Sequence, residues 1–194
     1  MNAMKGDAAR TPVNRADYRP PDWLIDTAVI TLDLNADTTC VSASLRVRRN
    51  PRADDSSASG AALVLHGDAL ETECVAVDGR ELDANAYSIG DDRLTIDGLG
   101  DSAIITTRVL IHPARNTALE GLYRSGSSLL TQCEAEGFRK ITWFGDRPDI
   151  MTRFHVRLEA DSDQYPVLLG NGNLVDSGSL GGNRHFAVWD DPFP

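Results

Sequence analysis

The sequence contains few cysteines, and they are poorly placed for covalent or metal chemistry. Its 194 residues include only three, Cys40, Cys74 and Cys133, which are far apart and form no C-x-x-C pair. An odd number of cysteines, spaced far apart, argues against a disulfide framework and against a thiolate zinc site. It favours a reducing compartment, because disulfide-dependent folds are typical of oxidising ones.

Long apolar runs are also missing. The first twenty residues, MNAMKGDAARTPVNRADYRP, contain no apolar core of the kind that a secretory signal needs. No apolar run approaches the roughly 20 residues that span a bilayer. We therefore predict a soluble cytoplasmic protein with no membrane partner.

Positive charge is scarce. Lysine and arginine together number 19 against 29 aspartates and glutamates, which gives a formal net charge of -10 at pH 7. Because binding to phosphates requires a basic surface, this balance argues against a nucleic-acid partner. A hydrophobic content of 41% and a charged content of 25% are ordinary for a globular protein, so a sizeable core is expected.

Familiar catalytic motifs are absent from the chain. It has no H-E-x-x-H pair, no G-x-S-x-G elbow, no P-loop and no dinucleotide-binding glycine pattern. We interpret the four histidines, His66, His112, His155 and His185, as strand-face or turn residues rather than metal ligands, because none lies within helical reach of another. Cys133 has no histidine near it in the sequence, so we interpret it as a strand residue rather than a nucleophile.

The sequence does contain segments in which apolar and polar residues alternate. In CVSASLRVRR, residues 40–49, serines and arginines occupy one face of an extended chain. The other face is apolar: Val41, Ala43, Leu45 and Val47. A period of two predicts a half-buried strand.

Turn signals separate many short segments of this kind. Asp78-Gly79 and Asp97-Gly98 are typical turn pairs, because glycine accepts a positive φ without a steric clash. The pattern predicts an all-β fold, an antiparallel β-sandwich or saddle-like sheets with at most one short helix. That helix is expected near residues 146–153, DRPDIMTR, where Pro148 suits a first turn.

The domain organisation is expected to be simple. Residues 1–17 are polar and are predicted to form a flexible N-terminal arm. Residues 18–194 show no fixed-period repeat, no low-complexity segment and no boundary, so they are predicted to form a single β domain.

The most unusual segment is TQCEAEGFRK, which begins at Thr131. If this segment is extended, Gln132, Glu134 and Glu136 point to one side. Carboxylates so close together repel one another, so a nearby cation would relieve them. On spacing alone, two interpretations stay open: an acidic edge paired with Arg139 or Arg147, and a ligand site such as a pocket for a cationic group.

This segment lies within a longer stretch from Asn116 to Asn173, NTALEGLYRSGSSLLTQCEAEGFRKITWFGDRPDIMTRFHVRLEADSDQYPVLLGNGN. It resembles the N-terminal domain of the bacterial aminopeptidase N family of zinc metallopeptidases. The DYRPPDW motif and the terminal DPFP look similar to the same family, so the resemblance spans about residues 18–194. Gly170 departs from a usual serine, and Gly145 from a usual larger residue.

The resemblance implies a β-saddle or sandwich that precedes a thermolysin-like catalytic domain. The family's T-Q-x-E element supplies a glutamine and a glutamate that grip the free α-amino group of the substrate, and these positions match Gln132 and Glu134. An amide oxygen and a carboxylate are both acceptors, which suits an ammonium group with three donors. Glu136 matches the bacterial form of the motif, but no binding role is carried over to it.

The resemblance further implies that the full-length enzyme uses zinc to remove N-terminal residues from peptides. The family's H-E-x-x-H ligands and G-A-M-E-N loop are absent from this chain. We therefore expect no metal site and no catalytic residue here, and we expect this fragment to be inactive alone. Its expected partners are peptide substrates, held by their free N-terminus, and the catalytic domain of the same polypeptide.

Two other functions stay open on the sequence. One is a free-standing β-sandwich module that binds a peptide or a carbohydrate, and the other is a structural domain that braces a catalytic neighbour. A reading frame that continues past Pro194 into H-E-x-x-H favours the aminopeptidase, whereas a stop codon there favours the binding module.

Overall fold

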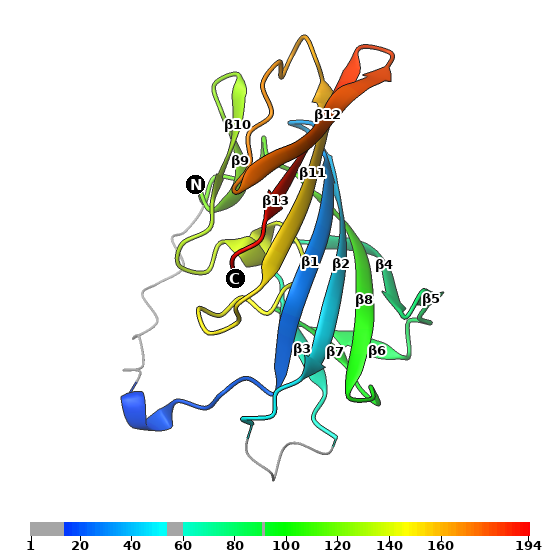
Figure 1. Ribbon diagram of the computed structural model, residues 1–194, viewed down its shortest axis with the longest axis vertical. Coiled ribbons are helices and arrows are strands. Elements are labelled where there is room, and N and C mark those ends of the chain that lie inside the picture. Colours follow the sequence, from blue (N-terminus) through cyan, green and yellow to red (C-terminus); the bar gives the residue numbers. More distant parts are fainter. Residues whose placement is uncertain (1–13, 54–59, 91) are drawn as a thin grey trace, which may run out of the picture.

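Regular structure in the computed structural model, which describes residues 14–53, 60–90 and 92–194, is almost entirely β-strand (Figure 1). The strands are β1 (Trp23–Asp33), β2 (Thr39–Arg49), β3 (Leu63–His66), β4 (Glu71–Val77), β5 (Arg80–Glu81), β6 (Tyr87–Ile89), β7 (Arg93–Ile96), β8 (Ser102–Ile111), β9 (Gly121–Ser125), β10 (Ser128–Gln132), β11 (Arg153–Asp161), β12 (Asn173–Gly181) and β13 (Arg184–Asp191). Two single-turn 3-10 helices, η1 (Arg15–Asp17) and η2 (Phe138–Lys140), are the helical segments of the described ranges. The all-β prediction is confirmed.

Three sheets make up the fold. The largest has eight strands in the order β12-β13-β11-β1-β2-β8-β4-β5, and the smaller sheets are β10-β9 and β3-β7-β6. Neighbouring strands are antiparallel, as the sequence predicts, except that β1 pairs with β11 in parallel. Alternation alone did not reveal this pair, because a parallel neighbour requires a long crossover that no local pattern records.

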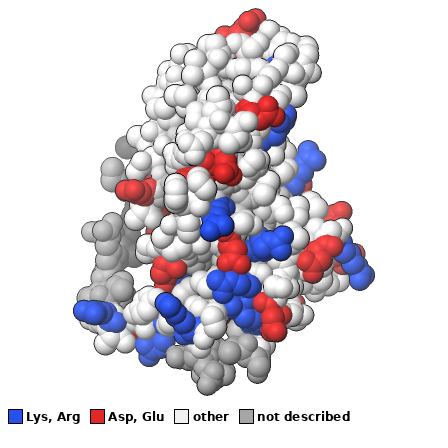
Figure 2. All heavy atoms as spheres, in the orientation of Figure 1, with Lys and Arg blue, Asp and Glu red and all other residues white. Residues whose placement is uncertain are grey.

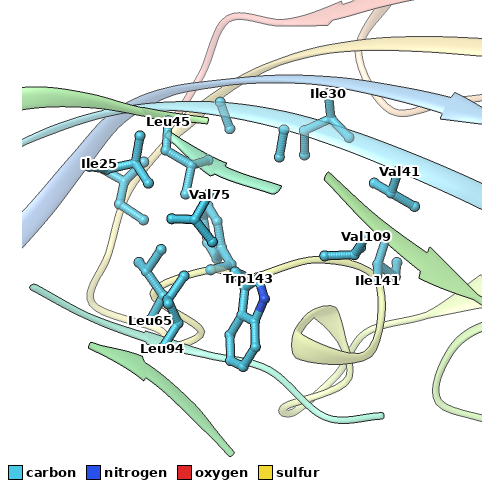
Figure 3. Close-up of a cluster of buried hydrophobic side chains, with 14 of the residues drawn as sticks. Ile25, Ile30, Val41, Leu45, Leu65, Val75, Leu94, Val109, Ile141 and Trp143 are labelled. Atoms are coloured by element: carbon cyan, nitrogen blue, oxygen red, sulfur yellow. The ribbon is translucent and has the colours of Figure 1, made fainter. Parts of the chain in front are cut away.

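The core lies between the large sheet and the three-stranded sheet. Figure 3 shows Leu65 and Leu94 of the small sheet facing Ile25, Leu45 and Val75 of the large one. The predicted alternation in β2 is confirmed, because from Cys40 to Arg48 the even-numbered side chains are more exposed than the odd-numbered ones, all of which are buried: Val41, Ala43, Leu45 and Val47. Burial of such side chains stabilises each by about 1.5–3 kcal/mol relative to exposure.

Trp143 closes the core on the side of η2. Its side chain is 3% exposed, and its indole Nε1 donates to the Thr72 hydroxyl at 2.9 Å. Gly67 lies directly against the indole ring, where a Cβ atom would overlap the ring carbons. The connection after β3 therefore needs glycine for this close approach.

The predicted helix near residues 146–153 is wrong. The segment forms a turn in which the Ile150 amide donates to the Arg147 carbonyl at 3.2 Å. The Arg147 guanidinium binds the Asp149 carboxylate at 2.7 Å, and the Tyr18 hydroxyl donates to the same carboxylate at 3.0 Å. Asp149 thus binds one residue within the turn and one that is far away in the sequence, Tyr18. The conformation of the turn therefore depends partly on a long-range contact.

The predicted N-terminal arm, residues 1–17, falls largely outside the described residues. Within the described ranges, no helix is long and apolar enough to cross a membrane. The single-domain assignment for residues 18–194 stays a prediction.

His112 links the end of β8 to two other segments, and this contact predicts a pH-dependent stability. Its Nδ1 lies 2.8 Å from the Asp37 carbonyl oxygen, and its Nε2 lies 2.9 Å from Glu71 Oε1. These two acceptors raise the pKa of His112, the carbonyl more than the carboxylate. The resulting stabilisation is fully present below about pH 6.5, the unfolded-state pKa, and is lost as pH rises through the higher folded-state pKa. We expect urea unfolding to show this loss.

The matching comparison is His112→Gln. Below about pH 6.5 the variant is expected to be less stable than the natural protein, and the difference should shrink as pH rises above the folded-state pKa. A difference that does not change with pH would show that the His112 contacts are not charge-dependent.

Candidate functional site

The acidic segment lies at the end of the β9–β10 hairpin rather than within a longer strand. β10 ends at Gln132, which pairs with Gly121 of β9. The chain then turns through residues 134–137, and the Gly137 amide donates to the Cys133 carbonyl at 2.8 Å. The condition that Thr131 to Glu136 is extended is therefore met only as far as Gln132.

A glycine makes this turn possible. A Cβ atom at Gly137 would lie 2.5 Å from the Gln132 carbonyl oxygen and 3.0 Å from the Cys133 Cα atom. Such distances are too short for a carbon in van der Waals contact. The turn therefore folds tightly against the end of β10, so Glu134 stays next to Gln132 despite the end of the strand.

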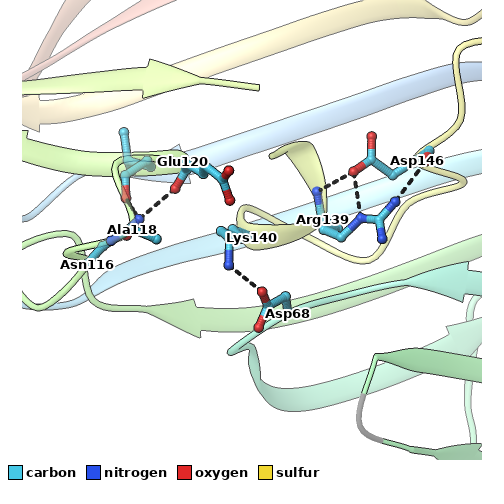
Figure 4. A network of polar contacts seen from close by, with 8 residues as sticks. Asp68, Asn116, Ala118, Glu120, Arg139, Lys140 and Asp146 are labelled. Atoms are coloured by element: carbon cyan, nitrogen blue, oxygen red, sulfur yellow. Dashed lines mark hydrogen bonds and ion pairs between the residues drawn. The ribbon is translucent and has the colours of Figure 1, made fainter. Parts of the chain in front are cut away.

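Partly buried ion pairs fix the turn to the body of the domain through η2. Arg139 Nε donates to Asp146 Oδ2 at 2.9 Å, and its Nη2 donates to the Asp146 carbonyl oxygen at 3.1 Å (Figure 4). The two side chains are only 17% and 11% exposed. Lys140 forms a second ion pair with Asp68. Sequence analysis missed the role of Asp146. The available signal was its distance of seven residues from Arg139, its partner in the ion pair.

The two glutamates of the turn have different surroundings. Glu136 Oε1 lies 3.4 Å from Arg139 Nη2, and its side chain is 70% exposed. The acidic-edge interpretation thus holds for Glu136 and Arg139, whereas Arg147 pairs with Asp149 instead. Within the described ranges, the Glu134 carboxylate forms no hydrogen bond and no ion pair.

Gln132 and Glu134 are brought together by a direct contact. The Gln132 side-chain Nε2 donates to the Glu134 carbonyl oxygen at 3.1 Å. This bond occupies the amide nitrogen and leaves the amide oxygen, like the Glu134 carboxylate, without a partner in the described part of the chain. The two exposed side chains therefore offer adjacent acceptors, an amide oxygen and a carboxylate, that can receive a group rich in donors.

Cys133 does not have the properties of a nucleophile. Burial, reinforced by the nearby Asp146 charge, raises the pKa of its thiol to about 11. The thiol therefore stays protonated near neutral pH, and a protonated thiol reacts poorly. Its side chain lines an apolar cavity together with Phe138 and Phe154. The interpretation of Cys133 as a strand residue is wrong by one position, because β10 ends at Gln132.

The described residues do not provide a metal site. No three histidine, cysteine, aspartate or glutamate side chains in the described ranges are arranged to hold a metal ion. A zinc ion in a longer protein would therefore need ligands from outside these residues, and no step of this domain can be assigned to it.

Comparisons with known proteins place these features in a family. The profile of the peptidase M1 N-terminal domain matches residues 30–194. The chain is 50% identical over 182 residues to aminopeptidase N of Caulobacter vibrioides and 43% identical over 180 residues to aminopeptidase N of Escherichia coli. These matches cover 94% and 93% of this chain but 20% of each relative, so the chain spans about one fifth of their length.

Solved structures agree with the sequence relatives. Aminopeptidase A of Legionella pneumophila, in complex with aspartic acid, superimposes with a TM-score of 0.84 at 29% identity, covering 92% of this chain and 21% of that one. A two-domain M1 zinc metallopeptidase, an E323A mutant bound to L-tryptophan, superimposes with a TM-score of 0.71 over 89% of this chain and 40% of that one. At 12% identity, the second likeness shows the fold alone.

Proposed function

Because this chain belongs to the family of peptidase M1 N-terminal domains, we propose that it is the N-terminal domain of a zinc-dependent aminopeptidase. In this proposal, Gln132 and Glu134 bind the free α-amino group of a peptide substrate. The observation that carries it is the pair of acceptors at the end of β10 that have no partner among the described residues, in a chain 50% identical to an aminopeptidase N.

The chemistry of the pair fits the α-amino group of a peptide. An ammonium group has three donors and a positive charge, and it needs acceptors at fixed positions. The Glu134 carboxylate supplies a charge-assisted bond, and the Gln132 amide oxygen supplies a neutral one. An internal peptide nitrogen has one donor and no charge, so the same pair discriminates against it.

The remaining parts of the active site belong to the rest of the polypeptide in this proposal. The described residues contain no group of side chains that could hold a metal ion, so in this proposal the role of the domain is to hold the amino group and to contact the catalytic domain. The alternative of a free-standing binding module has weaker support, because matches along more than nine-tenths of the chain are to aminopeptidases about five times as long.

The test of this proposal is hydrolysis by the full-length protein. We expect it to release the first residue from a peptide with a free amino group and to leave the N-acetylated form of that peptide intact. A chelator should abolish the activity and added zinc should restore it. The 194-residue chain is expected to release nothing. Equal cleavage of both peptides, or zinc-dependent cleavage by the 194-residue chain, would contradict the proposal.

A further inference from the structure

Two acceptors bind one amino group together only if both are held at fixed positions, so the contacts that hold Gln132 and Glu134 matter for the proposed function. On the face shown in Figure 2, the positive and negative side chains of the described residues are interspersed, so they attract a cation only weakly from a distance. Binding then depends on local geometry at the end of β10. In the described part of the chain, β9 is the strand that pairs with β10.

The start of β9 is packed against the structure that carries the pair. β9 begins at Gly121, which is buried and pairs with Gln132. Its φ is +69°, a conformation that glycine adopts without a steric clash. A Cβ atom here would lie 2.6 Å from the Cβ of Lys140 and 3.1 Å from the Gly137 carbonyl oxygen. Gly121 therefore touches both η2 and the turn that contains Glu134.

The side chain of Asn116 binds the backbone on both sides of Gly121. Its Nδ2 donates to the Glu120 carbonyl oxygen at 2.7 Å, and its Oδ1 accepts from the Ala118 amide at 3.1 Å (Figure 4). The same Nδ2 donates to the Leu122 carbonyl oxygen at 2.9 Å. One side-chain amide thus uses both of its hydrogens and its oxygen within a single loop.

This loop has an unusual backbone that needs such contacts. Residues 112–120 contain no strand and no helix. Leu119 has a φ of 58°, a conformation that is unfavourable for leucine and persists only where neighbouring contacts hold it. Residues 117–120 are exposed, so they add nothing to the core. The three bonds of Asn116 therefore set the path of the backbone into β9.

We propose that Asn116 is a positioning residue for the amino-group pair, Gln132 and Glu134. It holds the two carbonyls beside Gly121 and so fixes the start of β9, and the pairing of Gly121 with Gln132 fixes the end of β10 in turn. The Gln132 side chain donates to the Glu134 carbonyl oxygen at 3.1 Å, so both acceptors depend on the loop. This inference rests on the proposed function, from which it takes the role of the pair.

The test is Asn116→Asp in the full-length protein. The change keeps the size of the side chain and an acceptor for Ala118, but it replaces the donor to Glu120 and Leu122 by an oxygen. We expect kcat/KM for a peptide with a free N-terminus to fall about tenfold, because a small displacement of the groups that bind a substrate is costly. Hydrogen exchange of the backbone amides in residues 128–137 should become at least about threefold faster.

A coupling measurement separates positioning from a general loss of stability. In a protein that already carries Gln132→Ala and Glu134→Gln, Asn116→Asp should lower kcat/KM by no more than about twofold, because the contacts that it would misplace are already gone. An equal loss in the natural protein and in this double variant would overturn the proposal.

Asn50→Asp is the matched control. Asn50 follows β2 and is 7% exposed; its Nδ2 donates to the Pro21 carbonyl oxygen at 2.7 Å, and its Oδ1 accepts from the Arg52 amide at 3.0 Å. This variant should lower the free energy of unfolding, but it should change neither kcat/KM nor exchange in residues 128–137. A loss of kcat/KM as large as that of Asn116→Asp would overturn the proposal.

The exchange measurement keeps the two proposals apart. If the full-length protein cleaves no peptide, the proposed function fails and exchange alone decides whether Asn116 holds β10. Faster exchange of residues 128–137 in Asn116→Asp, but not in Asn50→Asp, would support that hold. Unchanged exchange in Asn116→Asp would overturn it, whether or not the protein is an aminopeptidase.

Discussion

Replacing Glu134 by glutamine in the full-length protein should lower kcat/KM for peptides with a free N-terminus about ten- to a hundredfold. The substitution keeps the size of the side chain and removes its charge, so it removes a charge-assisted bond worth roughly 1.5–3 kcal/mol. Steady-state kinetics on one peptide series measure this effect.

Two neighbouring variants serve as comparisons. Gln132→Ala removes a neutral acceptor, and we expect a smaller loss than for Glu134→Gln. Glu136→Gln is the control, because Glu136 is 70% exposed and already pairs with Arg139 at 3.4 Å. Exposed pairs of this kind contribute little. A greater loss at Glu136 than at Glu134, or near-natural efficiency for Glu134→Gln, would show that the pocket is assigned to the wrong residue.

Asp146→Ala is expected to destabilise the domain by about 1.5–3 kcal/mol, because it removes charge-assisted hydrogen bonds from the partly buried Arg139, which then keeps only the exposed Glu136 as a carboxylate neighbour. Asp146 accepts from both the backbone amide and the side chain of Arg139, at 3.1 Å and 2.9 Å. Loss of these bonds frees η2 and, with it, the turn that carries Glu134. Urea unfolding measures the change in the free energy of unfolding.

The exposed Arg48–Asp26 pair provides the matched control. Its side chains are 43% and 40% exposed, so Asp26→Ala should cost no more than about 1 kcal/mol. A second comparison is the double variant Arg139→Met with Asp146→Ala, which removes the unpaired charge and should be more stable than Asp146→Ala alone. The opposite order would mean that the Arg139 charge is not the source of the loss.

Strands and turns that depend on local pattern were predictable from the sequence. The alternation in β2 gave the correct buried face because side-chain direction in a strand follows directly from position. Asp78 and Gly79 both adopt positive φ, 51° and 80°, as a tight hairpin turn between β4 and β5 requires.

Features that depend on distant contacts were not predictable in the same way. The alternation of acidic residues after Thr131 suggested a strand, but Gly137 packs against the end of β10 and forces a turn. Pro148 suggested a helix, but Tyr18 and Arg147 bind Asp149 and hold a turn instead. In each case a contact with another part of the chain outweighed the local preference.

The candidate site was predictable only through resemblance. Spacing alone left a ligand site and an arginine-paired edge as alternatives, and the structure gives the two glutamates different surroundings, while the ligand role stays a prediction. Glu136 pairs with Arg139, and Glu134 is unpaired within the described ranges. The difference arises from the turn, whose geometry depends on η2 and on the partly buried Asp146.

The parallel pair of β1 and β11 determines the order in which a growing chain can complete its largest sheet on the ribosome. β1 ends at Asp33, and its parallel neighbour does not begin until Arg153. At about 5–20 residues per second, roughly 6–24 s separate the synthesis of these two strands. During that interval β1, β2 and β8 can already pair, but the other side of β1 is an open edge available to other chains. The edge of β1 is therefore open to strand-mediated aggregation until β11 emerges, and from then until β13 emerges the open edge is that of β11.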